Sequence, residues 1–210
     1  ETRPGQQQQQ EPVTDLNEEL FTEKEIEDQI KEQKNNKACG PDTIFNEYLK
    51  DTAPYLKGIW TRLLNECLKQ GDIPKCWRQA TVKVLYKGKG NTNDPNAYRG
   101  IALECAAFKL LTSLLTKLYK QTVDNIPIEQ FGFRKGQSTV QAVECLQNDI
   151  EEALRHHRGK LHAIFVDYTK AFDLLNRNLV IRNLEDITGR TYITRLLRNI
   201  LGNNTVIIDN

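Results

Sequence analysis

The chain has 210 residues, and its 29 Lys and Arg against 28 Asp and Glu give a formal net charge of +1. This length can bury one core or two small lobes without a metal or a disulfide, and the balanced charge excludes a bulk polycation, so any basic surface must be local. Five cysteines without a Cys-x-x-Cys pair argue against a disulfide framework and a structural zinc site.

No apolar run reaches the length of a membrane span, and none near the start of the chain resembles a signal peptide. We therefore expect a soluble intracellular protein of the cytoplasm or nucleus without a membrane partner. Residues 1–14 are polar and rich in glutamine, which predicts a disordered tail. The absence of methionine and the start at Glu1 indicate a processed chain, a fragment of a longer polypeptide or a sequence in which methionine was replaced.

The first predicted helix covers about residues 22–34. Thr22 and Glu25 have the spacing of a capping box, and Ile26 and Ile30 lie one helical turn apart on the same face.

Turn residues Gly40 to Asp42 follow, and Asp42 is expected to cap a short helix that Pro54 interrupts. A second helix is predicted from about Tyr55 to Gln70, where Gly71 ends it.

Alternating apolar residues predict a strand over 81–86, followed by a basic turn over 87–91. Apolar patterns predict helices over 103–119 and from Ser138 to about 159. The combination of strands and helices indicates an α/β (α+β) fold.

The last third of the chain begins with a predicted buried strand over 161–166 that ends in Asp167. Two short helices near 179–184 and 193–200 and a terminal strand over 205–208 follow. A carboxylate at a strand end needs a partner, and for Asp167 alone a helix cap or an ion pair competes with a divalent metal.

Five blocks in a fixed order carry a resemblance to a known family. Together they resemble the fingers and first palm blocks of reverse transcriptases, most closely those of non-LTR (LINE-like) retrotransposons, over about residues 20–210. The blocks are Ala38–Asp42, Trp77 with Ala80–Lys87, Asn96–Leu103 with Lys109, Gln130–Thr139 and Phe165–Asp173.

The resemblance implies a right-hand polymerase fold, helix-rich with a small antiparallel sheet, that contains the fingers and an incomplete palm. It implies residues 15–80 as a helical extension of the fingers, 81–158 as the fingers and 159–210 as a partial palm.

In this family the first carboxylate of the D-x-x-x-A-F-D pattern binds the two catalytic Mg²⁺ ions, and this maps to Asp167. The main-chain carbonyl of Tyr168 would join the metal shell. Phe172 corresponds to the ring that stacks under the nucleotide sugar, and ordinary core packing is the alternative. Asp173 fits a helix cap or a partner for Arg177 better than a metal ligand.

The resemblance also implies a nucleotide-binding pair on the fingers strands. Lys87 and Arg99 would hold the triphosphate, with Lys83 as the competing lysine. The alternative is that the lysines of this hairpin form a solvated face.

Template binding is implied for two loops. The loop before the helix at Ser138 would hold a template phosphate through backbone amides, Arg134 and Lys135, although a capped helix N-terminus alone explains much of the block. Gly40 corresponds to a block that abuts the template backbone, and a simple turn explains it equally well.

The sequence contains no Asp-Asp pair, which the family uses to complete the metal site. We therefore expect this chain alone to be inactive, and RNA template, primer DNA and Mg²⁺ to be partners of the intact protein. The alternative is a domesticated remnant that serves as a nucleic-acid-binding or protein-interaction module. In either case a second copy or a partner chain is expected to cover the open edge of the palm sheet.

Overall fold

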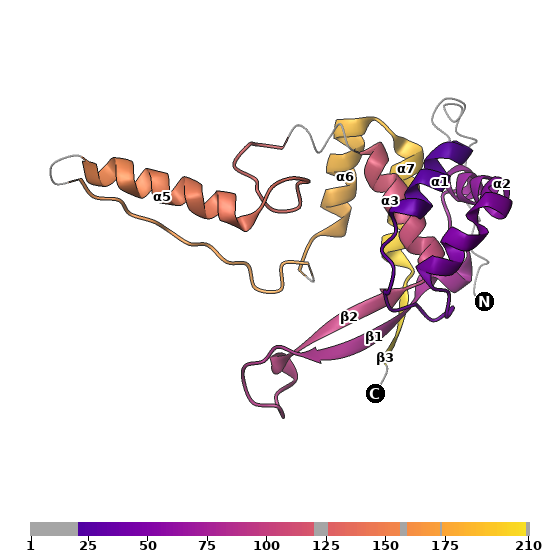
Figure 1. The fold of residues 1–210 in the computed structure, drawn as a ribbon, viewed down its shortest axis with the longest axis horizontal. Coiled ribbons are helices and arrows are strands. Elements are labelled where there is room, and N and C mark those ends of the chain that lie inside the picture. Colours follow the sequence, from indigo (N-terminus) through magenta and orange to yellow (C-terminus); the bar gives the residue numbers. More distant parts are fainter. Residues whose placement is uncertain (1–20, 120–125, 156–158, 173, 209–210) are drawn as a thin grey trace, which may run out of the picture. The chain divides into compact units, whose positions relative to one another are not determined.

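The computed structural model describes residues 21–119, 126–155, 159–172 and 174–208 (Figure 1). The chain forms α1 (Glu23–Glu32), α2 (Asn46–Gln70), a 3₁₀ helix (Lys75–Arg78), β1 (Gln79–Tyr86), a second 3₁₀ helix (Pro95–Ala97), β2 (Tyr98–Glu104), α3 (Ala106–Leu118), α5 (Thr139–Arg155), α6 (Arg177–Thr188), α7 (Thr191–Gly202) and β3 (Thr205–Ile208). The fold is α+β and rich in helix, as predicted.

The described residues form two compact units. The first contains residues 21–118 and 178–208, and the second contains residues 119–177. In the first unit, β1 and β2 form a hairpin that extends from a group of helices, and β3 lies along β1 (Figure 1). Among the described residues, no helix has the length and apolar composition needed to cross a bilayer.

Helix α1 confirms the predicted capping box. The Thr22 hydroxyl accepts a hydrogen bond from the Glu25 amide at 3.2 Å, and the Glu25 carboxylate accepts one from the Thr22 amide at 2.8 Å. Ile26 and Ile30 are fully buried where α1 packs on α2 and α3. The local pattern was therefore sufficient to predict this helix.

The predicted interruption at Pro54 is wrong, because α2 is one helix of 25 residues that contains this proline. An interior proline costs about 3 kcal/mol, so burial elsewhere along α2 must offset it. The buried face of α2 continues on both sides of Pro54, with Leu49 and Ala53 before it and Leu64 and Leu68 after it.

The prediction for the start of α2 is wrong, and the prediction for its end is confirmed. Asp42 does not cap the helix, since Phe45 occupies the N-cap position without a side-chain hydrogen bond. Gly71 ends α2 as predicted, with a φ of 64° in the left-handed region that glycine adopts at low cost.

The three-stranded sheet has the order β2-β1-β3. Strands β1 and β2 are antiparallel with Tyr86 opposite Tyr98, whereas β1 and β3 are parallel. The sheet is therefore mixed, and the predicted antiparallel sheet is correct for one pairing only. Leu103 belongs to β2 and not to the following helix, because it pairs with Thr81.

Gly40 lies where the turn before α2 meets the end of β2. Its carbonyl accepts a hydrogen bond from the Thr43 amide at 3.1 Å, which confirms the predicted turn. A Cβ at position 40 would lie 2.5 Å from the carbonyl carbon of Glu104 and 2.6 Å from the amide nitrogen of Cys105. Only glycine permits this approach between two backbones.

In the second unit, α5 begins after Ser138, as predicted. The Ser138 amide donates to the Gln141 side chain at 2.8 Å, and the Ser138 hydroxyl accepts from the Gln141 amide at 3.4 Å. No side chain of α5 is buried.

The predicted buried strand over 161–166 is wrong. These residues form no regular structure, and Phe165 is 82% exposed. A strand needs a hydrogen-bonded neighbour, and no described segment pairs with this one. The predicted tail over 1–14 and the cap predicted at Asp173 lie outside the described residues.

All five cysteine thiols are free. Cys67 and Cys105 are buried, Cys39 is half-buried, and Cys76 and Cys145 are exposed. Burial raises the pKa of the Cys67 thiol and of the Cys105 thiol to about 11, so both stay protonated at neutral pH.

The Gly40→Ala substitution should lower the free energy of unfolding by about 1–3 kcal/mol, because the new methyl group forces two backbones apart. Urea unfolding followed by circular dichroism measures the change. Gly202→Ala is the matched control, since its Cβ would meet no atom within 4 Å. Equal stability of the two variants would contradict the close approach at Gly40.

Thiol modification should distinguish the two exposed cysteines from the two buried ones. A maleimide should modify Cys76 and Cys145 rapidly in the native protein, whereas Cys67 and Cys105 should react only after unfolding in urea, because burial blocks access and suppresses the thiolate. Mass spectrometry of the digested protein identifies the modified residues. Modification of Cys67 in the native protein at the same rate as Cys145 would contradict the burial of Cys67 in the helical core of the first unit.

Candidate functional site

The β1–β2 hairpin collects basic side chains on one face. Lys83 lies opposite Ile101 and Leu85 lies opposite Arg99, so these four residues share a face of the sheet. Lys83 and Arg99 are diagonal neighbours there, a relation in which long side chains reach the same point. Both side chains are exposed.

Two tyrosines on the opposite face hold the hairpin loop. The rings of Tyr86 and Tyr98 lie 5.4 Å apart between centroids. The Tyr86 hydroxyl donates to the Gly90 carbonyl at 2.7 Å, and the Tyr98 hydroxyl donates to the Thr92 carbonyl at 2.9 Å. The predicted basic turn and the residues after it are therefore held at the end of the hairpin by these two hydroxyl groups.

Lys87 takes part in closing this loop. Its amide donates to the Ala97 carbonyl at 2.8 Å, and its ammonium group donates to the Asn96 carbonyl at 2.6 Å. A triphosphate would have to compete with the Asn96 carbonyl for this ammonium group. Lys87 thus has a hydrogen-bond partner within the loop, and Lys83 shares a face of the hairpin with Arg99.

The base of the hairpin is tied to two helices through Arg78, which precedes β1. Its guanidinium group contacts the Asp72 carboxylate and donates to the Asn199 carbonyl at 3.3 Å. The Asn199 side chain in turn donates to the Gly71 carbonyl at 3.1 Å. These contacts join α7 and the end of α2 to the start of β1, which orients the projecting hairpin.

Glu104 ends β2 beside Gly40 and is half-buried. Burial raises the pKa of its carboxyl group above the ordinary value, and the nearby Lys109 ammonium partly offsets this effect. The charged form is therefore disfavoured at the junction that supports the hairpin.

In the second unit, the loop before α5 is stabilised by Arg134. Its guanidinium group donates to the Pro127 carbonyl at 2.9 Å and to the Ile126 carbonyl at 3.4 Å, and the side chain is half-buried. Lys135 is exposed beside it. Arg134 therefore has a structural role in this loop, and Lys135 is the more accessible cation.

Asp167 and Tyr168 lie in the irregular exposed segment that follows residue 159. Asp167 forms no hydrogen bond or ion pair with another described residue. The described residues contain no group of three His, Cys, Asp or Glu side chains that could hold a metal ion. A single carboxylate does not fit a Mg²⁺ site, which needs further oxygen ligands.

Phe172 is 76% exposed, and the centroid of its ring lies 6.3 Å from that of the Phe133 ring in an edge-to-face arrangement. The core-packing alternative for Phe172 therefore does not hold within the described residues.

The comparisons with known proteins place these observations in a family. Residues 87–209 match the family described as reverse transcriptase (RNA-dependent DNA polymerase). This match covers more than half of the 210 residues, and the chain belongs to the reverse transcriptase family.

The relatives come from non-LTR elements, as the sequence blocks predicted. The chain is 31% identical over 153 residues to a probable RNA-directed DNA polymerase from transposon BS of Drosophila melanogaster, which covers 71% of this chain and 17% of that protein. It is 26% identical over 172 residues to a retrovirus-related Pol polyprotein from the type-1 retrotransposable element R1 of Bradysia coprophila, covering 80% and 17%. It is 27% identical over 155 residues to the RNA-directed DNA polymerase from mobile element jockey of Drosophila melanogaster, covering 72% and 17%. The chain thus spans about a sixth of the length of these relatives.

Sequence reasoning missed the two tyrosines that hold the loop. Their signal was present, since one tyrosine ends the predicted strand and the other directly precedes Arg99. Only the register of the hairpin shows that they face each other.

The pKa of Glu104 predicts a pH-dependent effect on stability. A carboxyl group whose pKa is raised by folding contributes stability at acid pH, and this contribution is lost as the pH rises through the raised value. The original protein should therefore lose this contribution as the pH rises from acid to neutral, whereas Glu104→Gln should not. The difference in free energy of unfolding in favour of the variant should grow over this range.

Urea unfolding midpoints at pH 4 to 7 measure this difference for Glu104→Gln. Glu144→Gln is the control, because Glu144 is exposed on α5. A difference that shrinks as the pH rises would contradict the assigned direction.

Proposed function

We propose that this chain forms the fingers and the first part of the palm of an RNA-directed DNA polymerase, with the boundaries 15–80, 81–158 and 159–210 for the helical extension, the fingers and the partial palm. The observation that carries the proposal is the anchored hairpin, which presents Lys83 and Arg99 on one face. Membership of the reverse transcriptase family supports nucleic acid as the substrate class.

The hairpin face is suited to binding the triphosphate of an incoming nucleotide. Arg99 presents a planar guanidinium group that can hold two phosphate oxygens at once, and Lys83 adds a compact charge beside it. The tyrosine contacts and the Arg78 contacts hold this face before the nucleotide arrives, which lowers the cost of ordering it. Lys87 would join once its ammonium group leaves the Asn96 carbonyl.

The second unit supplies most of the other proposed contacts. Asp167 would contribute one carboxylate, and Tyr168 one main-chain carbonyl, to a Mg²⁺ site whose remaining ligands the described residues do not provide. Phe172 would lie under the nucleotide sugar, and its exposure is compatible with that role. Lys135 and the backbone amides near Ser138 would hold a template phosphate, as a helix N-terminus permits. In the first unit, the turn that contains Gly40 would contact the template backbone.

A second candidate function is a retained binding module without polymerase activity. The exposed apolar side chains of α5 and of residues 161–166 favour this alternative, because such surfaces mark sites that another chain covers. A second copy of the chain or a separate partner is proposed to cover them.

Primer extension on an RNA template with Mg²⁺ and deoxynucleotides tests the proposed function. The 210-residue chain should incorporate no more nucleotide than its Asp167→Ala variant, because one carboxylate cannot hold the catalytic metals. In a longer polypeptide that contains this chain and the remaining polymerase blocks, Asp167→Ala should abolish extension.

In that longer polypeptide, Arg99→Ala should raise the KM for deoxynucleotides by about ten- to a hundredfold, the range for a lost hydrogen bond to a charged group. Lys24→Ala is the matched control, since Lys24 is an exposed cation on α1. An unchanged KM for Arg99→Ala would exclude the hairpin as the triphosphate site.

A further inference from the structure

Phe133, in the loop before α5, combines a costly backbone conformation with an exposed ring. Its φ of 64° lies in the left-handed region, which a bulky residue adopts only at a cost in free energy. The residue is 93% exposed, so burial of the ring does not offset this cost. Backbone strain of this kind is found most often at functional sites.

The loop holds Phe133 in this conformation. On one side of it, the Gln130 side chain donates to the Gly132 carbonyl at 3.0 Å. On the other side, the Arg134 guanidinium group donates to two carbonyls of the same loop, and the Gln137 amide donates to the Arg134 carbonyl at 3.3 Å. These bonds fix the backbone on both sides of Phe133, so the exposed ring projects from a fixed base.

The projecting ring contacts the ring of Phe172. The two centroids lie 6.3 Å apart and the ring planes are inclined by 87°, the edge-to-face geometry that aromatic pairs prefer. Among the residues that the structure describes, no other aromatic ring lies against Phe172. Its segment has neither helix nor strand, and the Leu174 amide donates to the Lys170 carbonyl there at 3.0 Å. The firmly bonded loop thus supports a ring on a less bonded segment.

The position of the Phe172 ring matters for the nucleotide sugar that is proposed to lie on it. A phenyl ring offers no hydrogen-bond partner to the 2′-hydroxyl by which a ribonucleotide differs from a deoxyribonucleotide. A hydroxyl group that loses water without gaining a partner is unfavourable, so a ring held against the sugar favours the deoxyribonucleotide. A ring that turns aside leaves room for water beside the hydroxyl, and this preference is then lost.

We propose that Phe133 is a positioning residue, which keeps the Phe172 ring against the nucleotide sugar and thereby contributes to the selection of deoxyribonucleotides over ribonucleotides. This inference rests on the proposed function, because Phe172 meets a nucleotide sugar only in a polymerase. Both residues are largely exposed, so the contact biases the position of the Phe172 ring and does not lock it. The effect on selectivity is accordingly moderate.

Primer extension by the longer polypeptide described above, with deoxynucleotides and with ribonucleotides in separate reactions, tests the proposal. Phe133→Ala should lower the ratio of kcat/KM for deoxynucleotides to kcat/KM for ribonucleotides by about two- to tenfold, the range for a lost aromatic pair. Most of this change should be a rise in kcat/KM for ribonucleotides. Phe133→Tyr keeps the ring and should keep the ratio.

Ile128→Ala is the matched control, because Ile128 is an apolar residue of the same loop and is 76% exposed. It should leave the ratio unchanged. A loss in Ile128→Ala as large as that in Phe133→Ala would attribute the effect to the loop in general and would overturn the proposal.

Phe133→Gly separates the role of the ring from that of the backbone. Glycine adopts a φ of 64° at low cost, so this variant retains the loop conformation and removes the ring. It should lower the ratio as much as Phe133→Ala does. If Phe133→Gly kept the original ratio, the role of Phe133 would lie in the loop backbone and the proposal would be wrong.

Phe172→Ala tests whether Phe133 acts through Phe172. It should lower the ratio at least as much as Phe133→Ala, and the double variant should show no further loss, because the ring to be supported is gone. A further loss in the double variant, or an unchanged ratio in Phe133→Ala, would overturn the proposal. Extension that still depends on Asp167 would leave the proposed function intact in those cases. Extension that survives Asp167→Ala, or no extension by the original longer polypeptide, would contradict the proposed function and this inference with it.

Discussion

The parallel pairing of β3 with β1 is the constraint on which the first unit depends. It sets Gln79 opposite Thr205 and Val82 opposite Ile208. More than 100 residues of chain separate these two strands. Parallel strands need a long connection, and here that connection includes the whole second unit together with α6 and α7. Because α7 directly precedes β3, the pairing also brings Asn199 to Arg78 and packs α7 on α2. The hairpin projects from this closed body, so the basic face depends on contacts made by the end of the chain.

The sequence predicted those elements whose signals are local. The capping box of α1, the alternation of β1, the glycine that ends α2 and the helix from Ser138 are all present. The failures involve contacts between distant residues. Pro54 remains inside α2 because buried residues on both sides outweigh its local cost, and residues 161–166 have strand composition but no described neighbour to pair with.

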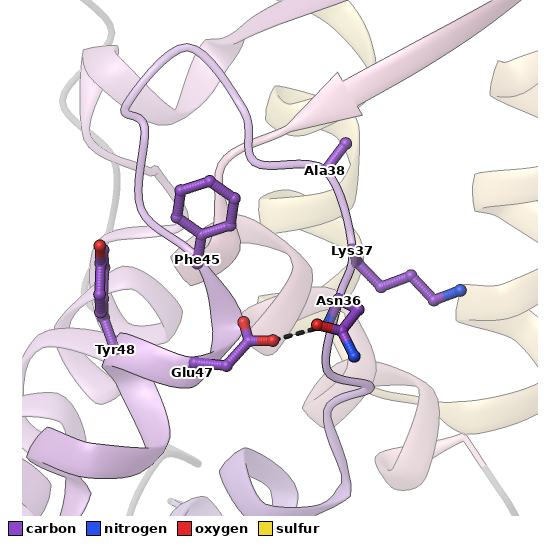
Figure 2. A pocket seen from close by; sticks show the side chains of 6 residues that line it. All are labelled: Asn36, Lys37, Ala38, Phe45, Glu47 and Tyr48. Carbon is purple, nitrogen blue, oxygen red and sulfur yellow. Dashed lines mark hydrogen bonds between the residues drawn. The ribbon is translucent and has the colours of Figure 1, made fainter.

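The candidate site was predictable to a different degree in each unit. The order of the sequence blocks indicated Lys83, Lys87 and Arg99, and the register of the hairpin then grouped Lys83 with Arg99. The attachment of residues 34–36 to α2 was not predictable, because it consists of hydrogen bonds between residues 11 to 15 positions apart that follow no helical or strand period (Figure 2 shows one of them). For Asp167 the sequence supplied a role by resemblance, and the described residues contain no group of three His, Cys, Asp or Glu side chains that could form a metal site.

Hydrogen exchange of the backbone amides tests most directly whether the first unit is one body closed by β3. If it is, amides in the paired stretches of Gln79–Val82 and Thr205–Ile208 should be protected together with those in the core of α3, whereas amides of residues 161–166 should exchange at nearly the rate of an unstructured peptide. Fast exchange throughout Thr205–Ile208 while α3 stays protected would contradict the account, because the hairpin would then be supported without the end of the chain.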